Sequence, residues 1–351
     1  MWWFLLLCIQ LCLCKSDSDT ECVYNMNTMN DDKDRRVNKN NLRIIQYNAE
    51  WLFLDYYSPM DCPGNGCTWK NESEAQIHLN YVAQVLNELN PDIVNICEVE
   101  GCDELHALTI ALNDTSYVPY LKKGTDTSTG QNVGMLTRID PISNISRIDS
   151  KYTYPIPNSN CGYTGPSGTT GLSKHSISEF VIGNYTVALI AAHLLAYPTD
   201  PTRCAEREAQ AMLLQQIVYD YIVNLHYEVI LLGDFNDYDA EVLDINNHTP
   251  TSRVLDIVKG LDTVKGLDNN QLYSLYNVAS LLKQEDRYSD WWDSDNNCAT
   301  NSQHDYSLID HILVSEQLQT HIVNMSIYHN YSEYCGKYNS DHYPLVIDFV
   351  F

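Results

Sequence analysis

The chain has 351 residues and a formal net charge of −25 at pH 7, from 21 Lys and Arg against 46 Asp and Glu. Proteins that hold nucleic acid by neutralising its phosphates are usually basic, so this composition argues against strong, processive binding to a duplex. A metal-dependent hydrolase tolerates such a charge, because the bound cation supplies positive charge where the phosphate reacts.

The first residues of the chain form an apolar run over 1–14. This run falls short of the ~20 residues that a spanning helix needs, so we interpret 1–16 as a secretory signal peptide, with a membrane anchor as the alternative. Residues 17–41 are polar and poor in aliphatic side chains, which predicts a flexible segment. No linker or break in composition follows, so 42–351 is expected to form one domain.

The remaining chain alternates between apolar strand patterns and helical periodicity, which indicates an α/β architecture with mixed sheets. Strands are predicted over 42–47, 93–97, 133–136, 177–181, 186–192 and 229–232, and helices over 73–89, 103–112 and 206–225. Two long stretches, 151–173 and 237–301, are not explained by this core. The second contains a predicted helical segment over 272–282, and long ordered loops of this kind are often functional.

Five polar clusters follow or lie within apolar runs that have the character of buried strands. They are 46–48, 97–99, 233–236, 308–310 and 340–344. In the last of them Asp341 and His342 stand side by side, and this pair can hold a metal and move a proton at one site. Polar groups delivered by several strand ends are typical of an α/β enzyme that builds its site at one edge of a sheet.

The ordered set of polar residues in these clusters, together with a histidine after the strand over 186–192, resembles the endonuclease/exonuclease/phosphatase superfamily. That group includes deoxyribonuclease I, abasic-site endonucleases, neutral sphingomyelinases and inositol polyphosphate phosphatases. The resemblance covers about 42–351 and implies a four-layer sandwich of two packed mixed β-sheets flanked by helices. The matching residues are Asn48, Glu98, His193, Asp234, Asn236, Asp310, Asp341 and His342.

Metal binding is expected from oxygen ligands, which hard divalent cations prefer. Glu98 ends a strand with an apolar interior, so its carboxylate must face solvent or a cation. The resemblance makes Glu98 the principal metal ligand, and Asp341 is expected to join it. Asn48 is expected to bind the substrate as a neutral donor and is also a candidate metal contact. Mg²⁺ is the expected cofactor, and Mn²⁺ or Ca²⁺ are alternatives.

The catalytic roles follow from side-chain chemistry and from the resemblance. His342 suits general acid–base work near neutral pH, and Asp310 would orient and stabilise its charge. Asp234 can position or deprotonate the water, and Asn236, two residues on, can donate to a phosphate oxygen. His193 resembles the second histidine of the deoxyribonuclease I and sphingomyelinase branches, where it would protonate the leaving group or grip the phosphate.

Basic residues outside these clusters are ambiguous. Arg138 and Lys174 stand at strand entries and are candidate contacts for the substrate phosphate, although a solvated surface role is equally expected. Arg207, on the predicted long helix, is interpreted as part of a structural ion pair. His311 is expected on the opposite face of its strand by alternation.

Secretion has independent support from sequons and cysteines. Three of the twelve cysteines lie in the apolar run, and the others are expected to form disulfides with one thiol left over, for which Cys22 is the candidate. Cys62 with Cys67, and Cys97 with Cys102, are close enough for small loops, and the pairing stays open. Longer bridges could use Cys161, Cys204, Cys298 and Cys335, and sequons begin at Asn71, Asn113, Asn144, Asn184, Asn247, Asn324 and Asn330.

The first functional hypothesis is a secreted, Mg²⁺-dependent endonuclease that cuts DNA, and as a further option RNA, with little sequence preference. It would be a monomer with nucleic acid as its substrate and no stable protein partner. The second is a phospholipid phosphodiesterase such as a sphingomyelinase, which would dock on membrane lipid through Trp291-Trp292 or the tyrosine-rich loop 152–163. These aromatic side chains could equally stack on bases. The third is a binding module that has lost catalysis, which the intact set of polar residues disfavours.

Overall fold

The computed structural model describes most of the chain from residue 33 onward. The described parts are Cys22, 33–54, Trp69, 71–261, 273–293, 303–331 and 339–351. The predicted signal peptide over 1–16 lies outside the described residues, and so do Cys62, Cys67, Cys298 and Cys335. No helix within the described parts combines the length and the apolar character needed to cross a bilayer.

One β-sheet has six strands, lying in the order β14–β15–β1–β2–β4–β3. Their bounds are β1 Asn41–Leu52, β2 Ile93–Val99, β3 Val118–Leu121, β4 Asn132–Thr137, β14 Ile322–Ile327 and β15 Leu345–Val350. β1 and β2 run parallel, whereas the other neighbours are antiparallel. The register of β1 and β15 pairs Asn41 with Val350, so the first and last strands of the domain are neighbours.

The second sheet has five strands in the order β10–β13–β9–β8–β7. Their bounds are β7 His175–Ile182, β8 Tyr185–His193, β9 Glu228–Asp234, β10 Leu275–Asn277 and β13 Asp310–Ser315. β8 and β9 are parallel, and the remaining pairs are antiparallel. Each sheet therefore contains one parallel pair, and both sheets are mixed, as the alternating pattern predicts.

A helix joins the two strands of each parallel pair, because a parallel connection needs a crossover. Helix α1 spans Glu72–Leu89, α2 Cys102–Leu112, α3 Pro201–Tyr219, α4 Val254–Val258 and α5 Glu316–Gln319. The side chain of Asn71 accepts a hydrogen bond from the Glu74 N–H at the start of α1. Asp200 does the same for α3, and Pro201 follows it at the first position, where no N–H is needed.

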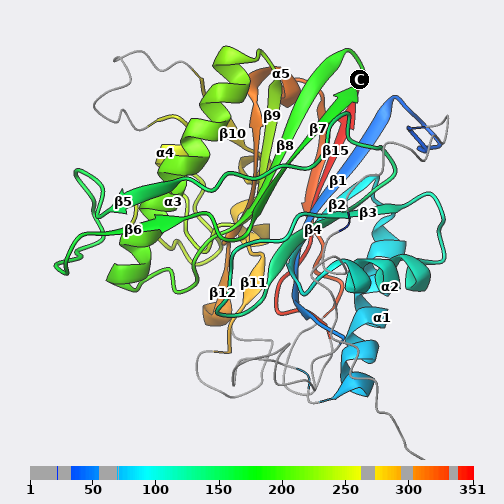
Figure 1. Cartoon of the computed structure of the whole chain (residues 1–351), viewed down its shortest axis with the longest axis horizontal. Coiled ribbons are helices and arrows are strands. Elements are labelled where there is room, and N and C mark those ends of the chain that lie inside the picture. Colours follow the sequence, from blue (N-terminus) through cyan, green and yellow to red (C-terminus); the bar gives the residue numbers. More distant parts are fainter. Residues whose placement is uncertain are drawn as a thin grey trace, which may run out of the picture.

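The two sheets pack face to face, with helices on their outer faces (Figure 1). Buried residues from both sheets, such as Ile44, Ile347, Leu189 and Ile312, form the central core. Residues of α1 and α2 form a second core with the outer face of the six-stranded sheet. Residues of α3 and α4 form a third with the five-stranded sheet. The expected four-layer sandwich is confirmed.

The approach of β8 to β9 requires a glycine at position 233. Gly233 has a φ of +152°, and a Cβ atom added there would lie 1.7 Å from the carbonyl oxygen of Ala192. No side chain fits at that distance, so the residue before Asp234 must be glycine. This close contact fixes where β9 delivers Asp234 relative to His193, which pairs with it in the register.

The two stretches outside the predicted core contribute short hairpins. β5 (Lys151–Tyr154) pairs with β6 (Gly168–Gly171), and β11 (Asp290–Trp291) pairs with β12 (Tyr306–Ser307). The helix predicted over 272–282 is not present in the described part of that range, where β10 and a 3₁₀ turn over Val278–Leu281 occur instead. Asn277 explains the difference, because its side chain accepts from the Ala279 N–H and so starts the short turn directly after the strand.

The expected small loop between Cys97 and Cys102 is not formed, whereas Cys161 and Cys204 form a longer bridge between two of the cysteines expected to do so. Cys22 is bonded to Cys102, and Cys161 is bonded to Cys204. Cys97 is the free cysteine of the described residues and is buried within β2. The expectation that Cys22 is the spare thiol was therefore wrong, because backbone hydrogen bonds between Cys22 and Leu121 bring it beside the start of α2.

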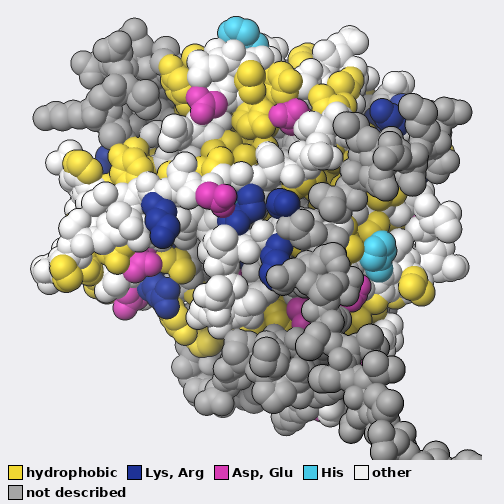
Figure 2. All heavy atoms as spheres, viewed as in Figure 1, with side chains coloured by type: hydrophobic (Ala, Val, Ile, Leu, Met, Phe, Trp, Pro, Cys, Tyr) yellow, Lys and Arg dark blue, Asp and Glu magenta, His cyan; other side chains and the backbone are white. Residues whose placement is uncertain are grey.

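The surface carries few basic side chains for its size. On the face shown in Figure 2, Lys and Arg side chains gather in the middle and to the left, with acidic side chains among them. They do not form a continuous stripe across this face. A stripe of that kind is the usual footprint of a protein that tracks a nucleic acid backbone.

Candidate active site

A cavity of about 670 Å³ opens where strands of both sheets end. Glu98 comes from the end of β2, His193 from the end of β8 and Asp234 from the end of β9. Asp310 begins β13, directly opposite Asp234 in the register, and His342 precedes β15. The fold thus brings together side chains that are far apart in the sequence, as the strand-end clusters predict.

Asp310 and His342 form a buried hydrogen-bonded pair, with 2.7 Å between Oδ2 and Nδ1. Ser289 donates to the same carboxylate oxygen over 2.9 Å, and Gln46 donates to the other over 3.1 Å. Burial disfavours a charged imidazole, but the Asp310 and Asp341 carboxylates outweigh burial and raise the pKa of His342 well above its ordinary value. This environment favours the charged form of the ring.

Asn48 links three of the polar groups at the base of the cavity. Its Nδ2 lies 3.2 Å from Glu98, 3.0 Å from Asp234 and 3.4 Å from Nε2 of His342. Its amide oxygen accepts from the Glu50 N–H over 3.0 Å. The amide nitrogen, which is a donor, thus faces the carboxylates, and the amide oxygen keeps a second lone pair, so metal binding by Asn48 stays a prediction.

Irregular backbone directs Glu98 into the cavity. Glu98 has a φ of +65° at a register shift in β2, and Glu50 and Trp51 have φ values of +47° and +55° at a matching shift in β1. Such conformations cost about 1–3 kcal/mol each in residues other than glycine, and they gather at functional sites. The Trp51 N–H donates to Glu98 over 3.1 Å, which holds the carboxylate in place.

Several carboxylates crowd one side of the cavity. Glu50 accepts from the Asp341 N–H over 3.0 Å, and Asp290 comes within 3.6 Å of Nε2 of His342. Burial, and then the Glu50 carboxylate, raise the pKa of Asp341 well above its usual range. Burial also raises the pKa of Asp290 to about 6. This crowding of oxygen donors fits a hard divalent cation, which would relieve the repulsion among Glu50, Glu98, Asp290 and Asp341.

The second histidine has the opposite electrostatic character to His342. Burial and the nearby Lys174 ammonium hold the pKa of His193 well below its ordinary value, so its ring is neutral. Nε2 of His193 lies 3.6 Å from Asp234. Burial and the Asp310 carboxylate raise the pKa of Asp234 to about 7. Asp234 is therefore poised to take a proton near neutral pH, whereas a neutral His193 is a poor acid.

The remaining predicted site residues lie at different distances from Asp234 and His342. Asn236 lines the cavity and donates from Nδ2 to the Leu194 carbonyl over 3.3 Å. Lys174 is buried behind His193, with 3.4 Å between Nζ and Nε2. Arg138 is a correction, because it stands after the end of β4, which runs antiparallel to β2 and so ends at the far edge of the sheet. There it forms an ion pair with Asp114 over 2.8 Å.

Arg207 and His311 are structural, as expected from the sequence. Arg207 is fully buried and forms an ion pair with Asp237 over 3.1 Å. It also donates to the carbonyl oxygens of 195–198, in the loop that follows His193. Nε2 of His311 donates to the Asp237 carbonyl over 3.0 Å, on the side of β13 away from the cavity.

Sequence reasoning missed Asp290 and Ser289, which come from β11 and the residue before it. In Figure 1, β11 and β12 lie below the ends of the two sheets. The segment sits in the long stretch over 237–301 that no strand pattern explained. A Ser-Asp pair directly before Trp291 was the available signal, and nothing in its spacing linked it to Asp310 or His342.

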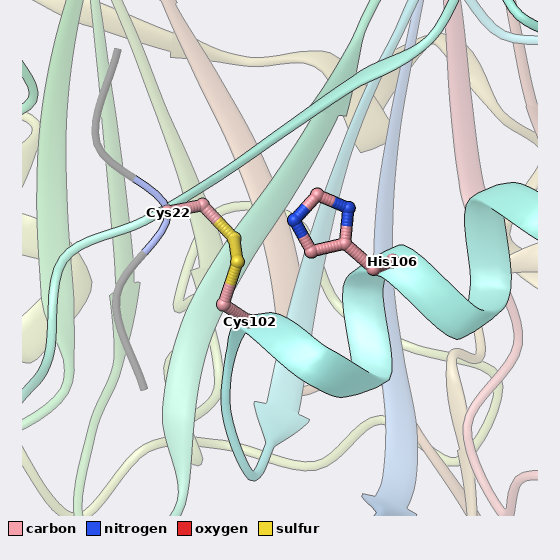
Figure 3. Close-up of side chains that lie close together, drawn as sticks. All are labelled: Cys22, Cys102 and His106. Atoms are coloured by element: carbon pink, nitrogen blue, oxygen red, sulfur yellow. A yellow bond between two sulfur atoms is a disulfide. The ribbon is translucent and has the colours of Figure 1, made fainter. Parts of the chain in front are cut away.

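A second group of possible ligands lies elsewhere, where Cys22 meets the first turns of α2. His106 stands beside Cys22 and Cys102 (Figure 3). These two sulfur atoms are joined in a disulfide, so neither is a thiolate, which is the form that binds metals. The group is therefore not a metal site in this state of the protein.

The sequence model described as the endonuclease/exonuclease/phosphatase family matches residues 45–332. No curated protein sequence matches the chain significantly.

Solved structures share the fold at low sequence identity. The structure of humanized D. rerio TDP2 has a TM-score of 0.52 and 17% identity, over 89% of this chain and 100% of that one. An endonuclease/exonuclease/phosphatase from Beutenbergia cavernae gives 0.52 and 17%, over 89% of this chain and 72% of that one. A protein of that family from Leptotrichia buccalis gives 0.53 and 13%, over 88% and 100%.

Proposed function

Because the chain belongs to the endonuclease/exonuclease/phosphatase family, we propose that it is a secreted, divalent-metal-dependent endonuclease that hydrolyses DNA with low sequence specificity. RNA is a further candidate substrate. The family acts on phosphate esters, and the chain retains a full set of groups for that chemistry. One observation carries the proposal: the Asp310–His342 pair faces the same cavity as the crowded carboxylates Glu98 and Asp341.

In phosphodiester hydrolysis, Asp234 serves as the base, and the imidazole of His342 serves as the acid or hydrogen-bond donor. Asp234, with a pKa of about 7, takes the proton from the attacking water. His342, kept charged by Asp310, donates an N–H to the phosphate or a proton to the leaving oxygen. Asn48 and Asn236 offer neutral donors, and the neutral ring of His193 lies beside Asp234, with 3.6 Å between Nε2 and the carboxylate.

A divalent cation is the expected partner of this site. Glu98 and Asp341, with Glu50 and Asp290 beside them, would hold it through carboxylate oxygens. The bound ion supplies positive charge at the reacting phosphate, which an acidic protein cannot supply from its surface. Mg²⁺ is our first choice because it prefers such ligands and keeps several waters.

Secretion is part of the same proposal. The disulfides Cys22–Cys102 and Cys161–Cys204 are compatible with an extracellular protein, because such bonds persist in oxidising compartments. The signal peptide that we propose for 1–16 would direct the chain there, and N-terminal sequencing of the secreted protein tests it.

Nicking of supercoiled plasmid by the mature protein with Mg²⁺ tests the nuclease activity. We expect nicking that disappears in excess EDTA and in the His342→Ala variant. The exposed His226 on the other side of the domain provides the matched control, and His226→Ala should cut like the wild type. Nicking that persists in EDTA would contradict the metal requirement, and full activity of His342→Ala would contradict the catalytic assignment.

A phospholipid phosphodiesterase is the second candidate, and one observation favours it. Tyr197 and Trp292 line the cavity and are about two-thirds exposed, at 65% and 66%. Exposed aromatic side chains at the mouth of a site can enter a lipid interface as readily as they stack on bases. Cleavage of sphingomyelin in liposomes without plasmid nicking would establish this candidate instead.

A further inference from the structure

A second imidazole–carboxylate pair lies at the edge of the same cavity, outside the set described above. Nδ1 of His248 is 2.7 Å from Oδ2 of Asp244. The backbone N–H of His248 donates to the other carboxylate oxygen of Asp244 over 2.9 Å. The Asp244 side chain is buried, whereas the imidazole of His248 is 37% exposed. The distance of 2.7 Å between Nδ1 and Oδ2 repeats that of Asp310 and His342, whose ring is buried whereas the His248 ring is partly exposed.

The pair is held by its surroundings rather than by chance proximity. The ring of His248 stacks on Tyr238, with centroids 4.8 Å apart and an angle of 23° between the planes. Gln284 donates to the Asp244 carbonyl over 2.9 Å, and Asn246 donates to the Tyr306 carbonyl over 2.7 Å. These contacts fix the turn that carries His248, so the free Nε2 side of the ring has a defined position.

The lining of the cavity is strongly acidic, so a histidine ring such as that of His248 has a specific use there. Among the described lining residues there is no Lys or Arg, and the carboxylates are Glu50, Glu98, Asp234, Asp290, Asp305 and Asp341. Histidines are thus the lining side chains that can carry positive charge. His342 serves the reacting phosphate, and His193 is neutral. Of the two remaining lining histidines, His248 is the one with a described hydrogen bond to a carboxylate, that of Asp244.

We propose that the Asp244–His248 pair binds a second backbone phosphate of the substrate, next to the phosphate that is cut. In this arrangement Asp244 accepts a hydrogen bond from Nδ1, and a phosphate oxygen accepts one from Nε2 of the same ring. This inference rests on the proposed function and deepens it, because it assigns an oligonucleotide chain, rather than an isolated phosphodiester, as the substrate. Tyr238, which stacks on the His248 ring, would hold it beside the path of the oligonucleotide substrate.

The test compares substrates that carry one phosphate with substrates that carry several. His248→Gln keeps a polar side chain, removes the imidazole ring and leaves the Asn247 sequon intact. The probes are bis(p-nitrophenyl) phosphate, the dinucleotide dTpdT, and single-stranded oligothymidylates of increasing length. His106→Gln, which removes an exposed histidine on α2, is the matched control, and a thermal melt of each variant checks its folding.

We expect His248→Gln to raise KM roughly tenfold for the longer oligothymidylates, which is the size of one lost charge-assisted hydrogen bond. Its kcat, and its KM for the two substrates with one phosphate, should stay unchanged. The dependence of log KM on log salt should also become less steep by about 0.7 for the variant, because one phosphate contact is lost. A merely structural role of the pair would leave this slope as it is.

Two results would overturn the inference without touching the nuclease function. One is an equal loss on all substrates, and the other is unchanged kinetics on every chain length. A wild-type protein that cleaves bis(p-nitrophenyl) phosphate and sphingomyelin but no oligothymidylate would overturn the nuclease function and this inference together. Asp244→Asn, which frees the ring, should reproduce the KM effect of His248→Gln if the pair acts as a unit.

Discussion

Asp310 and His342 are hydrogen-bonded over 2.7 Å although one begins a strand of the five-stranded sheet, β13, and the other precedes a strand of the six-stranded sheet, β15. Their contact therefore depends on how the sheets pack as well as on either strand. The Asp310 carboxylate is fixed by its hydrogen bonds and raises the pKa of the His342 ring. The expected activity of the site and its dependence on pH follow from this pair.

Replacing Asp310 with Asn should lower kcat by about 10²–10⁴-fold, because the amide can donate to Nδ1 and so favours the wrong tautomer of His342. The protein should still fold, since Asn has nearly the same shape. Plasmid nicking and circular dichroism measure the two properties. Asp348→Asn, at a surface ion pair with Arg43, is the control and should leave kcat unchanged. Wild-type activity in Asp310→Asn would contradict the role of the pair.

The rate should depend on pH through Asp234 and His342. Asp234 must lose its proton to act as a base, so kcat/KM should rise as pH increases through about 7. A bound cation favours the carboxylate form and moves this limb to lower pH. The rate should fall again only above the raised pKa of His342, where the ring loses its charge. Asp234→Asn should abolish the rising limb in a kcat/KM profile, and a rising limb that persists would rule Asp234 out as the base.

Cation binding should stabilise the fold, because the crowded carboxylates repel one another without it. At a Mg²⁺ concentration of 100 times Kd, the expected gain is about 2.7 kcal/mol. A thermal melt in Mg²⁺ against EDTA measures the shift. Glu98→Gln and Asp341→Asn should each reduce it, whereas Asp200→Asn, at the N-cap of α3, should not. An equal shift in all variants would place the ion elsewhere.

Gly233→Ala should be among the most damaging small substitutions in the domain. The added methyl would meet the Ala192 carbonyl oxygen at 1.7 Å, so β8 and β9 would have to move apart. We expect a loss of about 4–5 kcal/mol or a failure to fold. Gly130→Ala is the matched control, because Gly130 also has a positive φ, +73°, but has open space around it. Urea unfolding of both variants separates steric overlap from backbone strain.

The disulfide assignment predicts a simple pattern of stability. Cys22→Ser and Cys102→Ser should each lower the free energy of unfolding by about 2–5 kcal/mol. The double variant should be no less stable than either single variant, because one bond is lost in every case. Additive losses in urea unfolding would show that the two cysteines have separate partners.

The layered fold and most of the site follow from local patterns in the sequence. Runs of aliphatic residues before Glu98 and Asp234 predict buried strands, and the polar residue that ends each run predicts a common edge. His342 and Asp310 could be paired because hydrolases place a carboxylate behind a catalytic imidazole. These features depend on residue type and spacing, which the sequence contains directly.

Other features depend on strand direction or on contacts between distant segments, and these could not be predicted. Arg138 follows a strand just as Asp234 does, but β4 runs antiparallel to β2 and carries it to the opposite edge. Asp290 reaches His342 only because the hairpin of β11 and β12 folds back beneath the sheets. Cys22 finds Cys102 through a backbone bridge to Leu121, a contact with no sequence signature.

The pairing of Asn41 with Val350 means that the first and last strands of the domain start and finish side by side. The Phe351 N–H even donates to the Asn40 carbonyl over 2.9 Å. A short linker could therefore join these ends without crossing the molecule, at the cost of the Cys22–Cys102 disulfide, and new ends could be opened at the exposed turn over 183–184. The domain is thus suited to circular permutation, in which the order of its strands along the chain changes while the catalytic edge stays intact.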